Sequence, residues 1–445
     1  MPVRTLWFSE LNAAAASEVR RLLLAYRAAL FARLVGPALD IAQTSSDGEV
    51  GRGLGAYFEQ IQRRSQAGSD LPARHLAHWS PTFLLQRIVH PACSPDMRAR
   101  LVQHLLVRLM LDAAGAEDRL DRSLALPGPS SGQLIDLDAF KTFQLPAALA
   151  DGDPCGFEKP LSRARRMVGT LPSRFGSRLV GDCRLLGVDA AAKARPGAGA
   201  KARVLTFRRS IDEAHALLET AWPEAVQWVR LLVPAFADLG RPPSADLTRS
   251  ESYGPGCPIF LTRAPSGWNH AEDIVHEVQH HRFHLWILDR PFRSLSEETP
   301  RFVSPWRADV RPLYGLHLGL HAFVTVNQLR VRLQGRLTTR LRDEFVQTHV
   351  SNLFAFRSIL EHDDPTDEGR RYLVTVARAL LEHDRLFQAF ATPEVTARID
   401  AAFAGHCSRL SGSNGRLKNA GEAVRNRHAT LGLATHIMGG GADAH

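Results

Sequence analysis

Apolar residues recur every three or four positions along most of the chain. This spacing is typical of amphipathic helices, which have one apolar and one polar face. It predicts helices over five stretches, residues 11–34, 97–113, 210–233, 312–341 and 372–390. The third stretch is interpreted as one helix or two that end at Pro234, because proline cannot continue a helix.

Short apolar segments predict a small sheet in addition to the helices. They lie at residues 134–138, 184–188, 203–207 and 257–263. The last segment is bounded by Gly and Pro, as short buried strands commonly are. The two patterns together predict an α+β fold that is mainly helical.

A linker-like run predicts the main domain boundary. Residues 190–202 contain Arg195-Pro196-Gly197-Ala198-Gly199, a composition typical of flexible connections. We therefore expect a largely helical N-terminal region at 1–195 and a second domain at 200–445 that contains the small sheet. A chain of 445 residues is also too long for one ordinary core.

Composition narrows the class of protein. With 44% hydrophobic and 23% charged residues the chain reads as soluble and globular, and we see neither a membrane-length apolar run nor a secretory signal. We expect no membrane partner and a cytoplasmic location. Five dispersed cysteines without a CxxC pair argue against disulfides and a thiolate zinc site.

The net charge of +9 permits an acidic partner, but the basic residues are mostly scattered. The densest cluster, Arg163-Ala164-Arg165-Arg166, has no aromatic residues for base stacking. We interpret these arginines as solvated helix surfaces and expect no nucleic-acid partner.

Residues 276–280 form the pattern His-Glu-x-x-His inside a predicted helix. Asn269 and Glu272 have the spacing of a capping box, so we expect the helix to run from about His270 to Leu288. The motif predicts a zincin-like helix in the C-terminal domain. The competing interpretation is an amphipathic helix whose histidines are structural, in a peptide-binding scaffold without enzymatic activity.

The motif suits a metal ion because His276 and His280 leave one helical face one turn apart. Glu277 points to the adjacent face, where a carboxylate reaches metal-bound water or orients a ligand. The next predicted helix, 311–342, contains no Asp or Glu but has His317 and His321 four residues apart. A histidine from this helix is the better third ligand.

Carboxylates between the two helices are also candidates for the third ligand. Glu297, Glu298 and Asp309 could reach the metal if the loop that carries them folds over it. The spacing does not choose between zinc and iron, since three protein ligands with open positions suit either metal.

The motifs around this helix resemble a known family. The helix is followed by Ser304-Pro305-Trp306-Arg307-Ala308-Asp309-Val310-Arg311-Pro312-Leu313, then Gly315 and His317-Leu318-Gly319-Leu320-His321-Ala322-Phe323. This order is similar to the HExxH-motif family of peptide-modification proteins found near ribosomally made peptide natural products (RiPPs). The similarity covers roughly residues 203–341.

The resemblance implies an iron(II)- and 2-oxoglutarate-dependent oxygenase that hydroxylates the β-carbon of a residue in a precursor peptide. His276, His280 and His321 would bind the iron, with His317 as the alternative third ligand. Arg311 and Arg307 fall in the matching motif as partners for the far carboxylate of 2-oxoglutarate, a group that a guanidinium suits.

Arg332 is a third candidate for that role, eleven residues after His321 on the same helical face. Because the substrate would be a peptide, we expect an exposed strand edge at residues 257–263 to bind it by strand addition. The helical N-terminal region would then recognise a leader segment, for which the positive net charge favours acidic residues. The rival enzymatic reading is a zinc metallopeptidase with Glu277 as general base.

Overall fold

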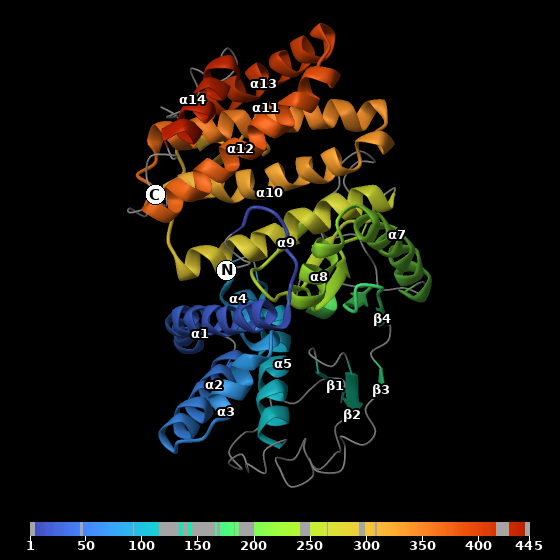
Figure 1. Ribbon diagram of the computed structural model, residues 1–445. Helices are drawn as coiled ribbons and strands as arrows, with labels where there is room; N and C mark the ends of the chain where they lie inside the picture. Colours follow the sequence, from blue (N-terminus) through green and yellow to red (C-terminus); the bar gives the residue numbers. More distant parts are fainter. Residues whose placement is uncertain are drawn as a thin grey trace. The chain divides into compact units, whose positions relative to one another are not determined.

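The computed structural model is mainly helical, with a small mixed sheet, as predicted (Figure 1). It describes the following residues: 5–44, 48–91, 93–114, 133–136, 141–144, 165–166, 170–181, 183–186, 200–240, 250–264, 266–292, 299–307, 309–414 and 427–440. Thirteen α-helices lie within these ranges. The linker at 195–199 lies outside them.

The chain forms two compact units, each assembled from separated stretches. Unit 1 contains Met1–Ala15, Ala216–Trp228 and Ala271–His445, and unit 2 contains Ala16–His215 and Val229–His270. Neither unit begins or ends at residues 195–200, where the linker predicts the domain boundary. Residues 1–15 belong to the same unit as residues 271–445, and residues 229–270 belong to the same unit as residues 16–215.

Unit 2 contains a group of helices that pack around an apolar core. Their bounds are α1 (Ala13–Thr44), α2 (Gly48–Gln66), α3 (Leu71–Ala77), α4 (Ser80–Val89) and α5 (Pro95–Ala114). Leu54, Phe83 and Leu105 are among the side chains wholly buried in this core. The helices predicted at 11–34 and 97–113 are therefore confirmed.

Among the described residues, α1 is long and apolar enough to cross a membrane, by length and composition alone. Its most apolar window has a mean hydropathy of 1.5, and 28% of that window is buried. The sequence pattern misses this property because Arg27 and Arg33 interrupt the run. A core helix or a signal sequence satisfies the same test, so α1 by itself assigns no location.

The main sheet of unit 2 has five strands in the order β4-β5-β6-β8-β7. Their bounds are β4 (Thr170–Pro172), β5 (Arg178–Val180), β6 (Ala235–Asp238), β7 (Ser250–Ser252) and β8 (Ile259–Leu261). β5, β6 and β8 run parallel, and β4 and β7 are antiparallel edges. A second sheet joins β1 (Gln133–Asp136), β2 (Lys141–Gln144) and β3 (Arg165–Arg166).

The strand predicted at residues 257–263 exists, but the expectation that its edge is exposed is wrong. β8 is buried and pairs with β6 on one side and with β7 on the other. Both of its backbone edges are already hydrogen-bonded, so a peptide cannot add to this strand.

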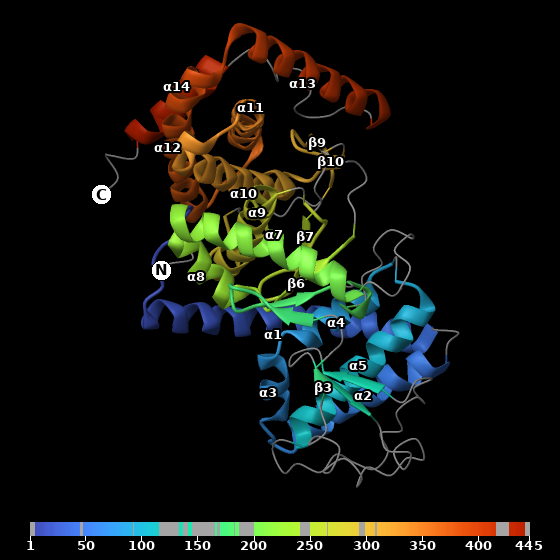
Figure 2. The same cartoon turned by 90° about the vertical axis from the view of Figure 1, so that its right-hand side faces the viewer.

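Two other predicted strands are helical in the structure. Residues 203–207 lie in α7 (Ala200–Ala221), and residues 184–186 lie in the 3-10 helix η4 (Cys183–Leu186). In α7 the buried residues Val204, Phe207 and Ile211 recur every three or four positions, so helical packing outweighs their preference for strands. α7 is followed by α8 (Pro223–Leu232), and Figure 2 shows α7 beside the main sheet.

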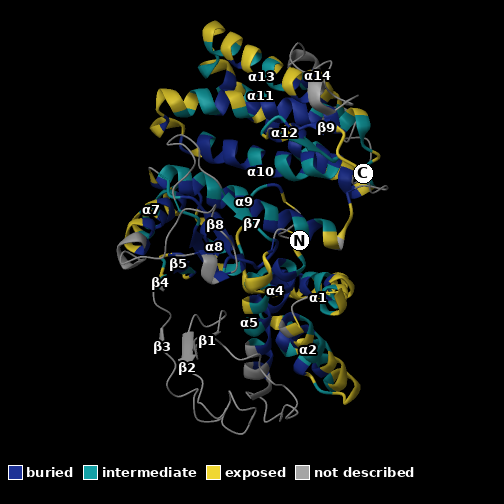
Figure 3. Cartoon of the chain, turned by 180° about the vertical axis from the view of Figure 1, so that it is seen from behind, coloured by how far each residue is buried: buried dark blue, intermediate teal, exposed yellow. Residues whose placement is uncertain are grey.

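Unit 1 is a stack of long helices. They are α9 (Gly267–Asp289), α10 (Leu313–Arg332), α11 (Thr339–His362), α12 (Asp367–Phe390), α13 (Pro393–Asn414) and α14 (Arg427–Gly440). A two-stranded ribbon, β9 (Phe302–Val303) with β10 (Val310–Arg311), lies between α9 and α10 in the sequence. Figure 3 shows α10 largely buried and α13 with many exposed residues.

Threonine side chains define where two of these helices begin. Thr338 accepts a hydrogen bond from the amide of Leu341, and Thr366 accepts one from Gly369, so each caps a free helix N-terminus. The predicted helix at 372–390 is confirmed within α12, and the one at 312–341 is divided between α10 and the start of α11. α9 begins at Gly267, three residues before the predicted start.

Candidate metal centre

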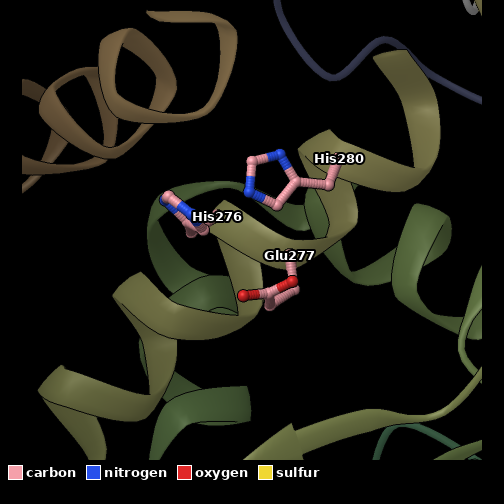
Figure 4. A group of neighbouring side chains, drawn as sticks. All are labelled: His276, Glu277 and His280. Carbon is pink, nitrogen blue, oxygen red and sulfur yellow. The ribbon is translucent and has the colours of Figure 1, made fainter. Parts of the chain in front are cut away.

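The three polar residues of the HExxH motif converge on α9. A metal-binding atom of His276, of Glu277 and of His280 all lie within 4.8 Å of one another, and Figure 4 shows both imidazoles on one side of the helix. The two rings have centroids 4.4 Å apart and are almost perpendicular. Nitrogens that share one ion at bonds of about 2.1 Å are separated by roughly 3 to 4 Å, so little movement is needed.

Both imidazoles are held in the form that binds metals. Burial and, to a smaller extent, the positive charge of Arg307 lower the pKa of His276 to about 4. Burial, followed by the neighbouring histidines, also lowers the pKa of His280 well below its ordinary value. At neutral pH both rings are uncharged and carry a lone pair, as a metal ligand must.

Helix α10 runs antiparallel to α9 along the site. Arg330 near the end of α10 binds Glu272 near the start of α9, and Tyr314 near the start of α10 is 3.0 Å from His284 near the end of α9. Between these pairs the ring of Phe323 lies 4.6 Å from that of His276. Unit 1 therefore places the second predicted helix directly beside the motif.

His321 of α10 is buried and faces α9. Its ring lies 5.2 Å from Phe283 and 6.0 Å from Trp286, and neither of its nitrogens has a hydrogen-bond partner. A positive charge on His321 would lower the pKa of His280. His321 is not part of the 4.8 Å group, but a buried imidazole with two unpartnered nitrogens fits a ligand position, since buried polar atoms are almost always bonded.

His317 occupies a different environment. Its Nε2 donates to Asp363 at 2.9 Å, and both side chains are almost wholly buried. Only Nδ1 of His317 therefore has no hydrogen-bond partner, whereas His321 has none at either nitrogen. Among the carboxylates between the two helices, Asp309 binds Arg311, while Glu297 and Glu298 lie outside the described residues.

An aromatic wall closes one side of the group. Trp306 stacks on Phe323 with ring centroids 5.0 Å apart, and Phe323 contacts His276. Gly319 allows this arrangement, because a Cβ there would lie 2.6 Å from the indole. The wall excludes water from one flank of the histidines.

The three arginines proposed to bind a co-substrate differ in the contacts that their guanidinium groups already make. Arg332 lies 4.5 Å over the ring of Trp222 and donates to the carbonyl of Ala221. Arg311 donates from two nitrogens to Asp309, at 3.1 and 2.7 Å. Arg307 is more exposed and lies 3.6 Å from the same carboxylate. Its positive charge contributes to the lowered pKa of His276.

Several residues that hold the site together were not found by sequence reasoning. Arg330 donates to both oxygens of Glu272, and Gln279 and Arg282 of the motif helix bind the N-terminal residues of the chain. A polar residue on the apolar side of a helix is the available signal for such contacts, and Gln279 and Arg282 both show it. Their partners lie more than 270 positions away and leave no local pattern.

No protein-family model matches this chain, and no curated protein matches it.

Proposed function

We propose that unit 1 is the catalytic part of an iron(II)- and 2-oxoglutarate-dependent oxygenase that hydroxylates a precursor peptide at a β-carbon. The observation that supports it is the convergence of His276, Glu277 and His280 within 4.8 Å on one helix, beside a helix that offers the unpartnered imidazole of His321. The resemblance of the surrounding motifs to HExxH-motif peptide-modification proteins supplies the reaction type.

In this proposal His276 and His280 hold the metal, and His321 completes the ligand set. When bound, iron(II) with 2-oxoglutarate supplies the oxidative chemistry for hydroxylation. Glu277, which is 2% exposed, lies beside the two imidazoles and orients a ligand or bound water through its carboxylate. Trp306 and Phe323 shield the histidines from bulk water.

Arg307 is the proposed partner for the far carboxylate of 2-oxoglutarate. It is more exposed than Arg311, and its positive charge acts directly on His276. A guanidinium there pairs with a dicarboxylate through two charge-assisted hydrogen bonds. Arg332 is a weaker choice because its guanidinium is already stacked on Trp222.

A zinc metallopeptidase is the second candidate, because Glu277 lies among the ligand atoms where a general base is needed. Peptidases with the same motif take a third ligand from a carboxylate on a following helix. α10 has no Asp or Glu along its whole length. The adjacent helix therefore favours a three-histidine site over the two-histidine, one-glutamate set of such peptidases.

Iron(II) loading without oxygen separates the two candidates. We expect 2-oxoglutarate to produce a weak visible charge-transfer band with the iron-loaded chain, and His280→Ala to abolish it. The matched control is His75→Gln on α3, which replaces a buried histidine of unit 2 and should retain the band. Tight zinc binding together with a failure to bind iron would instead favour the peptidase, with Glu277→Gln as the next variant.

The peptide substrate is tested with the full chain. An isolated segment 1–190 would separate residues 1–15 from the unit to which they belong. We expect the full chain to retain a precursor peptide with an acidic leader on a column, and to bind a leader with neutralised carboxylates more weakly. Equal retention of both would remove the charge-based recognition of the leader.

A further inference from the structure

Residues 5–8 form an irregular segment that lies against the motif helix. We define the N-terminal strap as residues 5–8, Thr-Leu-Trp-Phe, all within unit 1. Leu6 is wholly buried and Phe8 is 5% exposed. Side chains of α9 donate hydrogen bonds to backbone carbonyls of the strap. The contact therefore fixes the position of the strap backbone along the helix.

Arg282 binds three successive carbonyls of the strap. Its guanidinium donates to the carbonyl oxygens of Thr5 at 2.7 Å, Trp7 at 2.9 Å and Leu6 at 3.4 Å. The same guanidinium lies between the rings of Phe8 and Trp228, 4.9 and 4.5 Å from their centroids. Because Arg282 is wholly buried, these acceptors replace the water that its charge would otherwise need.

Gln279 extends the contact to helix α10. Its amide nitrogen donates to the carbonyl of Leu6 at 2.8 Å and to the hydroxyl of Thr325 at 2.7 Å, and its oxygen accepts from Arg282 at 2.6 Å. Thr325 in turn donates to the carbonyl of His321. A continuous chain of hydrogen bonds thus joins the strap to the turn of α10 that carries the proposed third ligand.

These contacts flank a proposed metal ligand. Gln279 precedes His280 in the sequence and Arg282 follows it by two positions, so any rotation or slide of α9 that breaks them also moves the imidazole. Side chains that fix the orientation of ligands commonly change metal affinity by about 10- to 100-fold when removed.

We propose that the N-terminal strap, through Gln279 and Arg282, positions α9 against α10 so that His276, His280 and His321 can bind one metal ion. This inference rests on the proposed metal centre. Gln279 and Arg282 are positioning residues in this scheme, because they bind the strap and do not contact the metal.

The test measures cobalt(II) affinity of the full chain by its visible absorption. We expect Gln279→Leu to weaken binding by about tenfold or more. We expect a chain that begins at Ser9 to lose more, and a synthetic peptide of residues 1–11 added in excess to restore affinity. A scrambled peptide should have no effect. Gln279→Leu removes hydrogen bonds without removing the strap, so it remains informative if the shortened chain does not fold.

The matched control is Ile399→Ala, which creates a cavity in a separate apolar cluster of unit 1 that contains no strap residue. It lowers the free energy of unfolding by about 2 to 5 kcal/mol and should leave cobalt(II) affinity unchanged, which separates positioning from general stability. Wild-type affinity in Gln279→Leu would overturn the inference while the metal centre stands. A failure of the wild-type chain to bind metal would overturn both.

Discussion

Arg330 of α10 donates to both carboxylate oxygens of Glu272 on α9, at 2.6 and 3.0 Å, one turn before the first motif histidine. Both side chains are largely buried. Removing one partner of a buried pair leaves an uncompensated charge. We expect Arg330→Gln to lower the free energy of unfolding by about 3 kcal/mol, measured by urea denaturation.

The exposed pair of Arg370 and Asp367 provides the control for this prediction. Arg370→Gln should cost less than about 1 kcal/mol, since surface ion pairs contribute little. In Glu272→Gln/Arg330→Gln, the loss should be smaller than the sum of the two single losses. Additive losses would show that the two residues do not interact in solution.

His321 and His317 are expected to respond differently to truncation. His321→Ala should lower metal affinity by at least about tenfold, because it removes a proposed ligand whose nitrogens have no other partner. His317→Ala should leave affinity within a few-fold of the wild type. It should instead lower the free energy of unfolding by about 3 kcal/mol, because Asp363 loses its buried partner.

Isothermal titration with cobalt(II) and urea denaturation of the same samples measure the two effects. The opposite pattern, with metal affinity lost only in the His317 variant, would assign the third ligand to His317.

Arg307 and Arg332 offer a matched pair for co-substrate binding. Arg307→Gln should raise the KM for 2-oxoglutarate by about tenfold or more, as expected when a charge-assisted hydrogen bond is lost. Arg332→Gln should leave KM unchanged, because its guanidinium is engaged by Trp222 and Ala221. Steady-state oxygen consumption measures both values, and a larger effect in the Arg332 variant would reverse the assignment.

The stability of the chain should fall in mild acid, in part through His383. Burial, then the nearby His349, lowers the pKa of His383 to about 3, and its Nε2 donates to Gln328. A folded-state pKa below the unfolded value of about 6.5 gives full stability above pH 6.5 and progressive loss below it. Between pH 6.5 and 5 this one residue accounts for about 2 kcal/mol.

Urea midpoints at pH 7 and pH 5 test this contribution. The loss on acidification should be about 2 kcal/mol smaller in His383→Gln than in the wild type, while His270 and other buried histidines still contribute in both. An identical loss in the two proteins would mean that His383 is charged or exposed in the folded state.

The parts of the fold that sequence predicted well are those with long, repeated local patterns. α9 was expected because apolar residues and a helix start surround the HExxH motif, and its existence is confirmed. The segment at 203–207 was predicted as a strand because a window of five residues holds Val204 and Phe207 without showing that Ile211 continues their spacing. A window of five residues is too short to distinguish the 3.6-residue period of a helix from the two-residue period of a strand.

The sequence predicts only the part of the site that lies on a single helix, α9. His276 and His280 are fixed by their spacing, whereas the choice between His317 and His321 depends on how α10 packs. One turn separates these two residues, and only packing gives one of them to Asp363 and leaves the other facing α9. Contacts such as that of Arg282 with Thr5 join distant parts of the sequence, so composition and periodicity carry no sign of them.

The burial of the N-terminal strap also sets an order of events during synthesis. Leu6 and Gln279 are 273 residues apart in the chain. At ribosomal rates of about 5 to 20 residues per second, the strap waits on the order of 15 to 55 seconds for α9 to be made. The apolar residues Leu6, Trp7 and Phe8 stay exposed during that interval, so unit 1 reaches its final packing only after most of the protein has left the ribosome.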